Sequence, residues 1–277
     1  MDDALSISVV LYKSNIQQLQ HLLGCISATT LPHQIYFIDN SPSDKLRHEL
    51  KTFIENGEIE YIFNGKNLGY GAAHNIAIKK VLQKNKYHLV LNPDIAFDKG
   101  ILEELYNYME SNKNVGVVLP KVLYPNGNLQ YVCKLLPTPL NLVSRLFPNN
   151  LFKKYNQKFE LHFSGHNEIM NIPYLHGCFL FLRIEALKTI GLFDERFFMY
   201  PEDIDLTRRL HKKYATIYYP YVLIFHKHAK ASFKNSRMFM IHAYNIIKYF
   251  NKWGWFFDKD RKKINQVVLK QLKQTEQ

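Results

Sequence analysis

A chain of 277 residues with 47% hydrophobic and 22% charged residues is typical of a globular protein, built as one large α/β domain or two small ones. It has no apolar run of the roughly 18 residues that a membrane-spanning helix needs, and its acidic start, Met1-Asp2-Asp3, is unlike a signal peptide. Three widely spaced cysteines argue against a disulfide framework or a CxxC metal site, so we expect a cytoplasmic protein.

The first 120 residues alternate between short β-branched runs and amphipathic helical patterns. This alternation predicts right-handed crossovers and a mainly parallel sheet, and hence a nucleotide-binding half over residues 1–120. The predicted strands are 7–12, 35–38, 60–63 and 88–91, and the predicted helices are 16–26, 46–54, 69–82 and 101–109.

After residue 120 the pattern is less regular, although the chain is expected to continue as one domain whose second half, 121–277, is the acceptor and catalytic half. Residues 137–173 show weak periodicity and predict an irregular insertion, interpreted as a substrate lid. The predicted strands here are 117–122, 178–183 and 217–225, and the predicted helices are 185–190 and 202–213.

The net charge of +12 is concentrated at the C-terminal end. From residue 226 onward there are twelve Lys and Arg against three Asp and Glu, interspersed with Trp253, Trp255, Phe256 and Phe257. A basic, aromatic, helical tail is typical of contact with anionic lipid headgroups or a phosphate-bearing substrate. The alternative is a solvated basic helix. No helix-turn-helix or zinc-finger spacing accompanies the charge, so we expect no nucleic-acid partner.

The apolar end of the predicted strand 88–91 is followed directly by Asn92-Pro93-Asp94, so the Asp94 carboxylate lies at the carboxyl end of that strand. In open α/β sheets, ligands bind at the carboxyl ends of the strands. One carboxylate there could hold a divalent cation whose shell is completed by diphosphate oxygens and water. The alternative is that Asp94 only caps the following helix.

Two further carboxylates, Glu202 and Asp203, open a predicted helix just after an aromatic run at 197–200. An apolar wall raises the proton affinity of a carboxylate toward that of a useful base. Adjacent helical residues point in different directions, so only one of the two carboxylates can act as the base, and we favour Asp203. The alternative is a helix-dipole interaction, with Lys212 and Lys213 at the other end.

Three other positions could contribute to a site. Asp39-Asn40 ends a strand and could contact a base or ribose, or could form an Asx-turn. The loop with Gly69 and Gly71 could present backbone N–H groups to an anion, but His74 takes the place of the third glycine of a dinucleotide fingerprint. His226 and His228 follow a strand, and imidazole is a good ligand for manganese or zinc.

In this order and spacing, the motifs resemble those of the family 2 inverting glycosyltransferases, most closely the rhamnosyltransferase-like branch from bacterial O-antigen and capsular polysaccharide synthesis. The resemblance runs from residue 7 to about residue 265. The matching motifs are Val9-Val10-Leu11-Tyr12, Ile38-Asp39-Asn40-Ser41, Asn67-Leu68-Gly69-Tyr70-Gly71, Leu91-Asn92-Pro93-Asp94, Gly191-Leu192-Phe193-Asp194-Glu195, Phe198-Met199-Tyr200-Pro201-Glu202-Asp203-Ile204-Asp205-Leu206, and His226 followed by Ser232.

The resemblance implies a GT-A fold, a nucleotide-diphosphate sugar donor and a divalent metal, Mg²⁺ or Mn²⁺. By likeness, Asp203 is the catalytic base, and Asp94 and His226 are the metal ligands. Asn92 stands where the strict DXD motif has its first Asp, and Leu11 stands where threonine is usual. The remaining assignments are, on the donor side, Asp39, Asn40, Asn67, Gly69, Gly71, Asn92 and Asp94, and, on the acceptor side, Glu202 and His176.

The predicted activity is metal-dependent transfer of a sugar with inversion, in cell-surface polysaccharide synthesis. The preferred candidate for the donor is dTDP-rhamnose, and UDP-sugars are the alternatives. The expected acceptor is a saccharide that is lipid-linked at the inner membrane face. Two alternatives stay open: nucleotidyl transfer, for which only Lys66 offers a basic group near the phosphates, and an inactive carbohydrate- or membrane-binding module.

Overall fold

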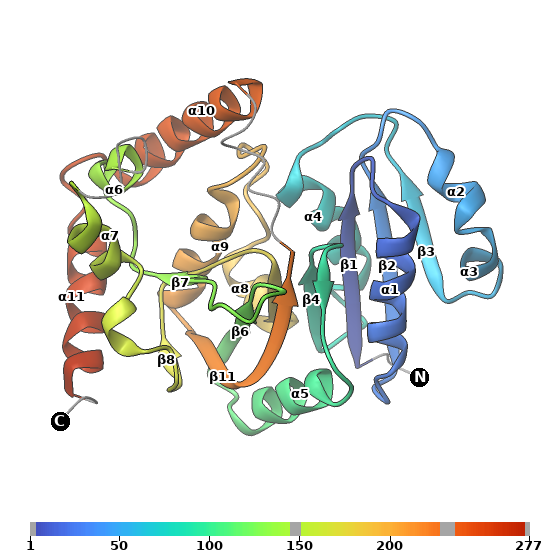
Figure 1. Cartoon of the computed structure of the whole chain (residues 1–277), viewed down its shortest axis with the longest axis horizontal. Helices are drawn as coiled ribbons and strands as arrows, with labels where there is room; N and C mark the ends of the chain where they lie inside the picture. Colours follow the sequence, from blue (N-terminus) through green and yellow to red (C-terminus); the bar gives the residue numbers. More distant parts are fainter. Residues whose placement is uncertain (1–3, 145–150, 228–235, 275–277) are drawn as a thin grey trace.

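One central sheet takes strands from both halves of the sequence (Figure 1). The computed structural model describes residues 4–144, 151–227 and 236–274. The strand order is β3-β2-β1-β4-β10-β6-β11-β5, and β8 pairs with β11. The strands are β1 (Leu5–Leu11), β2 (His33–Asp39), β3 (Ile59–Phe63), β4 (Tyr87–Leu91), β5 (Ile95–Ala96), β6 (Val115–Leu123), β8 (Met170–Asn171), β10 (Phe179–Arg183) and β11 (Ala215–His226).

The sheet is mainly parallel, which confirms the predicted α/β class. Strands β3, β2, β1 and β4 all run in one direction. Strand β10 is antiparallel to its neighbours β4 and β6, and β11 is parallel to β6. The register pairs Leu11 with Asp39 and Asp39 with Phe63, so the carboxyl ends of β1, β2 and β3 are level with one another. This level edge gathers the side chains discussed below.

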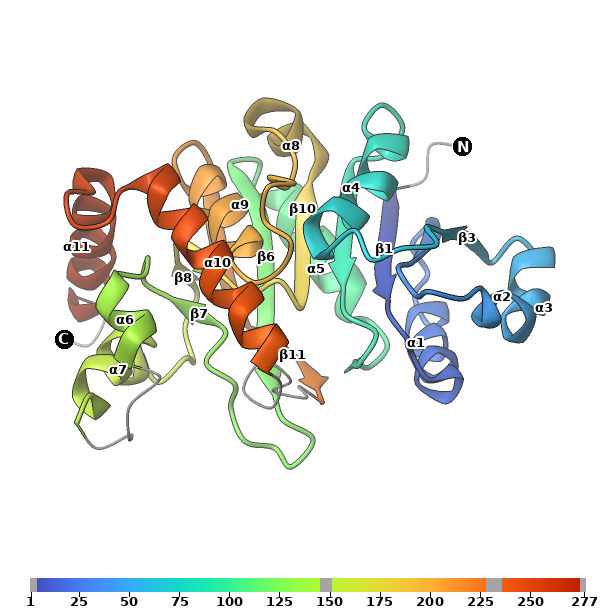
Figure 2. The same ribbon diagram turned by 90° about the horizontal axis from the view of Figure 1, so that it is seen from above.

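Helices cover both faces of the sheet, so its central strands are buried and mostly apolar. Helix α4 packs on β1 and β2, while α1 lies on the opposite side (Figure 2). Helix α1 begins where the Asn15 side chain accepts hydrogen bonds from the N–H groups of Gln17 and Gln18. The helices of the first half are α1 (Ile16–Ser27), α2 (Lys45–Glu49), α3 (Lys51–Glu55), α4 (Tyr70–Val81) and α5 (Ile101–Ser111).

A buried polar cluster interrupts the apolar core below the level edge. Ser8 Oγ lies 2.6 Å from Nδ1 of His74 and 2.7 Å from Nε2 of His88, and Ser6 Oγ lies 2.8 Å from Nδ1 of His88. Burial lowers the pKa of His88 to about 3 and that of His74 well below its usual value, so both rings are neutral. His74, at the third-glycine position, is therefore a core residue that pairs with serine.

The region predicted as an irregular insertion contains short helices. Helix α6 starts at a capping box between Thr138 and Asn141. Leu136 and Asn265 exchange two hydrogen bonds of 2.9 Å, which attach the beginning of this region to α11. The described part of this region is therefore more regular than predicted, because local contacts and contacts with the tail stabilise short helices. Its interpretation as a substrate lid stays a prediction. The elements of this region are α6 (Pro139–Val143), α7 (Lys153–Phe159), a 3-10 turn (His162–Ser164) and β8, and a small sheet of β7 (Cys133–Lys134) and β9 (Tyr174–Leu175) lies beside it.

The C-terminal tail forms two helices, as predicted. Helix α10 lies across α9, and α11 descends beside α6 and α7 (Figure 1). Within the described ranges, no helix combines the length and apolar character that crossing a membrane requires. The helices of the second half, besides α6 and α7, are α8 (Ile184–Ile190), α9 (Glu202–His211), α10 (Ser236–Trp253) and α11 (Lys259–Gln274).

Candidate functional site

The two predicted metal ligands meet through a short strand pairing. Asp94 directly precedes β5, and His226 is the last residue of β11. These strands are antiparallel, with His226 opposite Ile95, so the pairing brings the two side chains together. Nε2 of His226 lies 3.3 Å from Oδ1 of Asp94. The other candidates from this motif, His228 and Ser232, lie outside the described residues.

Gln130 sets the orientation of the His226 ring. Its Nε2 donates to the carbonyl oxygen of His226 at 2.6 Å, so its Oε1 is left to accept from Nδ1 of His226 at 3.0 Å. Nδ1 therefore carries a proton, and Nε2 faces Asp94. Burial lowers the pKa of His226, but Cys178 and Asp94 outweigh it and raise that pKa to about 10. Without an ion the ring is therefore protonated at both nitrogens, and a metal would have to displace the proton from Nε2 in order to bind there. The sequence offered no signal for Gln130, because it lies in no recognisable motif.

The pair fits a divalent cation. Two neighbouring ligands on one ion with bonds of about 2.1 Å stand about 3 Å apart, close to the 3.3 Å between Asp94 and His226. One carboxylate oxygen and one imidazole nitrogen suit manganese, and the contact with Gln130 is the outer support that ligating histidines usually have. Across the described residues no group of three or more His, Cys, Asp or Glu side chains could hold a metal, so other oxygens would complete the shell.

Asp203 sits in the first turn of α9, held by two backbone N–H groups. Gly177 N donates to its Oδ2 at 2.9 Å and Ile204 N donates to its Oδ1 at 2.7 Å. The residue is 5% exposed, and burial raises its pKa to about 7. A Cβ at position 177 would lie 3.2 Å from Cβ of Asp203, a tight contact that would press on this carboxylate. A carboxyl group that titrates near neutral pH can act as a general base.

The two acceptor-side candidates are Glu202, which precedes Asp203 on α9, and His176, which precedes Gly177. Burial and the charge of Asp203 raise the pKa of Glu202 well above its usual value, and its Oε2 has no hydrogen-bond partner among the described residues. A neutral Glu202 can therefore donate a hydrogen bond. Nδ1 of His176 accepts from Cys178 N at 3.2 Å, and the His176 ring centroid lies 6.1 Å from that of His226.

Tyr70 links the metal-side pair to Asp203. Its hydroxyl lies 2.8 Å from Oδ1 of Asn92 and 2.6 Å from the carbonyl oxygen of Gly177. Gly177 in turn holds Asp203, and Asn92 lies 3.4 Å from Nε2 of His226. A few contacts thus connect residues more than a hundred positions apart in the chain. The sequence placed Tyr70 inside a motif but gave it no role.

The donor-side residues form a second cluster at the ends of β2 and β3. Asp39 is fully buried, and its carboxylate accepts from the Tyr61 hydroxyl at 2.5 Å and from Ser41 N at 2.8 Å. Asn40 donates to Oδ1 of Asn67 at 3.2 Å and to the carbonyl oxygen of Gly69 at 3.1 Å. Asn40 therefore ties this strand end to the glycine loop, and its amide is engaged with protein atoms.

Close packing explains the two glycines of that loop. Gly69 has φ +88°, and a Cβ there would lie 2.2 Å from the carbonyl oxygen of Phe198. A Cβ at Gly71 would lie 2.9 Å from Cβ of Phe193. The start of α4 thus rests directly on the segment that leads into α9. The assignment of Gly69 and Gly71 to nucleotide binding stays a prediction.

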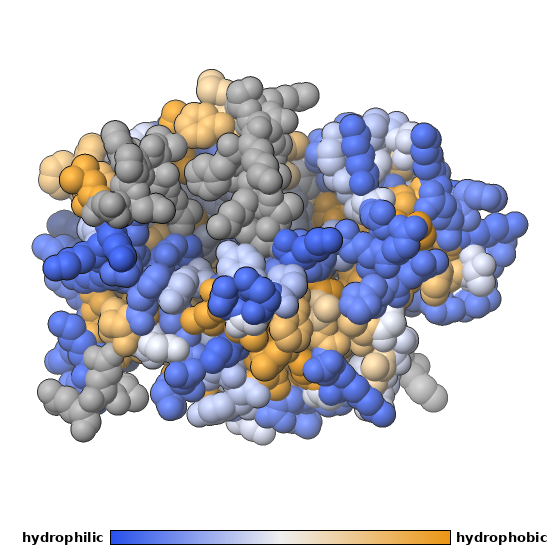
Figure 3. Space-filling model, viewed as in Figure 1, coloured by the Kyte–Doolittle hydropathy of each residue, from blue (hydrophilic) through white to orange (hydrophobic). Residues whose placement is uncertain are grey.

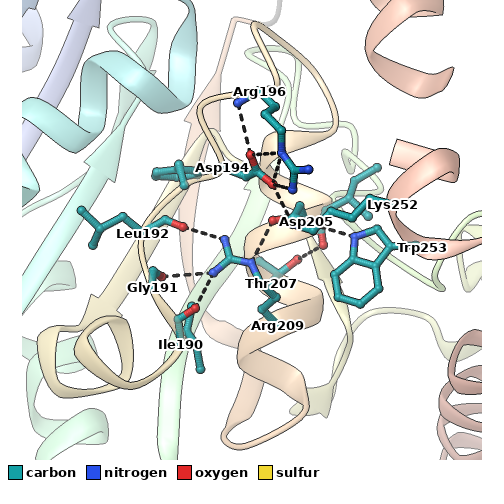
Figure 4. A network of polar contacts seen from close by, with 12 residues as sticks. Ile190, Gly191, Leu192, Asp194, Arg196, Asp205, Thr207, Arg209, Lys252 and Trp253 are labelled. Atoms are coloured by element: carbon teal, nitrogen blue, oxygen red, sulfur yellow. Dashed lines mark hydrogen bonds and ion pairs between the residues drawn. The ribbon is translucent and has the colours of Figure 1, made fainter. Parts of the chain in front are cut away.

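A polar network anchors α9 on α10 (Figure 4). Asp205 is fully buried and accepts from Arg209 at 2.8 Å, from Lys252 at 2.5 Å and from the Trp253 indole at 2.8 Å. Lys252 also bonds Asp194 at 2.8 Å. The acids at 194 and 205, which belong to the sequence motifs, therefore position the helix that carries Asp203 rather than face a ligand.

Helix α10 also supports the strained residue before α9. Tyr200 has φ +92°, an uncommon conformation for a residue with a side chain. Its ring stacks on His242 with centroids 4.3 Å apart, and Asn245 bonds Phe198 N and the carbonyl oxygen of Met199. The turn that presents Glu202 and Asp203 is thus held from the C-terminal tail.

Comparison with known proteins identifies the class. The model of the family Glycosyl transferase family 2 matches residues 6–191. N-acetylglucosaminyl-diphospho-decaprenol L-rhamnosyltransferase of Mycobacterium tuberculosis is 25% identical over 248 residues, 84% of this chain and 78% of that one. Rhamnosyltransferase WbbL of Escherichia coli is 26% identical over 242 residues, 83% of this chain and 87% of that one. Low-salt glycan biosynthesis hexosyltransferase Agl10 of Haloferax volcanii is 29% identical over 218 residues, 77% of this chain.

Solved structures share the fold at low identity. GalNAc-T7 with UDP, GalNAc and Mn²⁺ superimposes with a TM-score of 0.61 at 15% identity, over 80% of this chain. The mannosyltransferase PcManGT of Pyrobaculum calidifontis, in complex with GDP-Man and Mn²⁺, gives 0.58 at 15% identity, over 90% of this chain and 63% of that one. The match spans 63% of the Haloferax enzyme and 42% of GalNAc-T7, less than two thirds of either. The family resemblance expected from the motifs is confirmed: this chain belongs to glycosyl transferase family 2 and has a GT-A-like fold.

Proposed function

We propose that this glycosyltransferase moves rhamnose from dTDP-rhamnose, with UDP-sugars as the next candidates, to a lipid-linked saccharide, with inversion, in cell-surface polysaccharide synthesis. Two of the relatives are named rhamnosyltransferases, and the name of one specifies a decaprenol-linked acceptor. Family membership favours sugar transfer over nucleotidyl transfer.

The observation that carries this proposal is the buried Asp203, with a pKa near 7, linked through Gly177 and Tyr70 to the Asp94–His226 side. Asp203 removes the proton from an acceptor hydroxyl as that oxygen bonds to the anomeric carbon. The bond from that carbon to the diphosphate oxygen breaks at the same time, and the electron pair leaves with the nucleotide. Attack opposite the leaving group inverts the configuration. Neutral Glu202 donates to the acceptor, and His176 lies on the same side.

On the donor side, Asp39 holds the edge of the base at the end of β2, and the loop of Asn67, Gly69 and Gly71 lines the nucleotide. Asn40 keeps that loop in place through its two hydrogen bonds. Asp94 and His226 would hold a divalent metal, Mg²⁺ or Mn²⁺. When bound, such an ion offsets the negative charge that grows on the departing diphosphate.

The tail supports peripheral contact with the inner face of an anionic membrane. Figure 3 shows apolar side chains over α10, where Met240 is 66% and Tyr244 60% exposed. At the turn between α10 and α11, Phe256 is 76% and Phe257 97% exposed. Exposed lysines follow at once on α11: Lys259, Lys262 and Lys263. Exposed aromatic rings beside lysines suit the interface of an anionic bilayer.

A donor panel with the Asp203→Asn variant tests the transferase assignment. With Mn²⁺ present, the wild type should hydrolyse one nucleotide sugar slowly without acceptor, and dTDP-rhamnose is the expected one. Asp203→Asn should reduce transfer by about 10²-fold or more, because general base catalysis is lost, while calorimetric donor binding stays within a few-fold of wild type. Release of nucleotide from no donor would indicate a binding module, and equal loss of transfer and donor binding in the variant would show that Asp203 serves structure.

A further inference from the structure

Asn92 occupies the place where the metal side and the Asp203 side meet, between Tyr70 and His226. We propose that its carboxamide turns its NH₂ group to Tyr70 and its oxygen toward Asp94 and His226, so that Asn92 is a third protein ligand of the divalent cation and Tyr70 is its positioning residue. This inference rests on the proposed function, because it assumes an ion at Asp94 and His226.

The hydrogen-bond capacity of Tyr70 sets the orientation. A phenol has one proton to donate. The carbonyl oxygen of Gly177, 2.6 Å from the Tyr70 oxygen, can only accept, so it takes that proton. The atom of Asn92 that lies 2.8 Å from the same hydroxyl must then be a donor. Because the two ends of a carboxamide have nearly the same shape, a half-turn of the amide places NH₂ there without moving any other atom.

The same half-turn brings the amide oxygen to the metal side. The position 3.4 Å from Nε2 of His226 is then occupied by oxygen, while Oδ1 of Asp94 lies 3.3 Å from the same nitrogen. Both separations are close to the roughly 3 Å between neighbouring ligands of one ion. The Asn92 backbone is fixed, because its N–H donates to the carbonyl oxygen of Cys178 at 2.9 Å. Both oxygens thus lie at a ligand-to-ligand distance from Nε2 of His226.

This set explains how an asparagine can stand in a position where the strict motif has aspartate. A neutral amide oxygen, one carboxylate and one imidazole give the ion less negative charge than two carboxylates. The nitrogen ligand favours Mn²⁺ over Mg²⁺. An aspartate has two equivalent oxygens, and either can face the ion. An asparagine has only one, and Tyr70 fixes the amide so that this oxygen faces the ion.

Binding of Mn²⁺ alone, followed by the electron paramagnetic resonance signal of the free ion, tests the ligand. Asn92→Ala should weaken Mn²⁺ binding at least about tenfold, since even the loss of an outer support costs that much. Asn92→Asp should bind as well as or better than wild type. Asn56→Ala, a surface change, is the matched control and should bind as the wild type does. Unchanged binding in Asn92→Ala, with binding lost in Asp94→Ala, would overturn the inference and leave the proposed function intact. Unchanged binding in Asp94→Ala would overturn both.

Tyr70→Phe in two backgrounds separates positioning from general support of the fold. With Asn92 present, loss of the hydroxyl should weaken Mn²⁺ binding about fivefold, the effect of one ordinary hydrogen bond. In the Asn92→Asp background it should have little effect, because either carboxylate oxygen can face the ion. Equal weakening in both backgrounds would show that Tyr70 acts only through the fold, against the proposal.

Discussion

At the residue scale, Asp203 is placed where a carboxylate is costly to ionise. Two backbone N–H groups favour its charged form, yet burial outweighs them and raises its pKa to about 7. In the unfolded chain the same group titrates near 3.8. The folded protein therefore holds this proton over a range where the unfolded chain has lost it. The raised pKa that suits a general base thus lowers the free energy of unfolding as pH rises.

This argument predicts a pH-dependent gap in stability between wild type and Asp203→Asn. A raised folded pKa contributes stability below about pH 4 that is lost as pH rises through 7. The free energy of unfolding of the variant, relative to wild type, should therefore increase by up to about 4 kcal/mol between pH 4 and pH 8. Urea unfolding at both pH values measures it, and the buried histidines cancel because both proteins contain them. Glu202 does not cancel: without the charge of Asp203 its pKa is raised less in the variant, which widens the gap in the same direction. A constant gap would mean that Asp203 is ionised throughout.

At the element scale, the C-terminal helices support α9, the helix that carries Asp203. Arg208 on α9 makes a two-pronged ion pair with Asp258 at the start of α11, with bonds of 2.7 and 2.8 Å and both side chains almost fully buried. Together with the Asp205–Lys252 contact, this pair joins α9 to the tail from two directions. Movement of the tail would therefore change the position of Asp203.

We predict that Asp258→Ala destabilises the protein by about 3–5 kcal/mol, because it leaves the guanidinium of Arg208 buried without its partner. Asp260→Ala provides a matched control two residues away. Its ion pair with Lys212 is exposed, so that change should cost less than about 1 kcal/mol. Chemical denaturation of the three proteins gives both values. Similar losses in the two variants would argue against a special role for the buried pair.

The elements that the sequence predicted well are those with a local signal. β-Branched runs marked the strands, and chain order placed Asp39 and Asp94 at one edge of a parallel sheet. The antiparallel entry of β10 and the two-residue strand β5 had no such signal, because both depend on pairing with distant strands. The approach of His226 to Asp94 could therefore be expected only from the family resemblance.

The residues that support the site could not be predicted from the sequence, for the same reason. Gln130, Tyr70 and Gly177 act through single contacts with residues far away in the chain. Membership of a motif, in turn, does not by itself indicate contact with a ligand. Asp205 stands in a motif next to Asp203, yet its carboxylate is fully used in anchoring α9. A motif indicates which residues matter, and only the contacts show whether they face a ligand or the fold.

At the scale of the whole molecule, charge and exposed aromatic rings lie at the tail end. The lysines of α11 follow directly on Phe256 and Phe257, and α10 connects this region to the turn before α9. A membrane contact made there would be transmitted by a continuous helix to the turn that carries Glu202 and Asp203.

We predict that wild-type protein binds vesicles containing phosphatidylglycerol and that binding weakens as salt is raised. The double change Phe256→Ser and Phe257→Ser should weaken it at least about tenfold, since two rings no longer enter the interface. Val267→Ser, at a 47% exposed position on α11, is the control and should bind normally. Sedimentation with vesicles measures all three, and equal binding by the double variant would exclude this turn as the contact.

The two-residue pairing of β5 with β11 has a consequence for how the protein would handle its ion. The strand pairing that holds Asp94 beside His226 consists of Phe225 opposite Ala96 and His226 opposite Ile95, at the border of the sheet. Outside it, the Lys227 N–H donates to the carbonyl oxygen of Asp94 at 3.1 Å, and Gln130 holds His226. Such a border can fray while the apolar interior stays closed. Chelation should thus yield an apo protein that is still folded and ready to be reloaded, in contrast to a zinc finger, whose fold collapses once its metal is withdrawn.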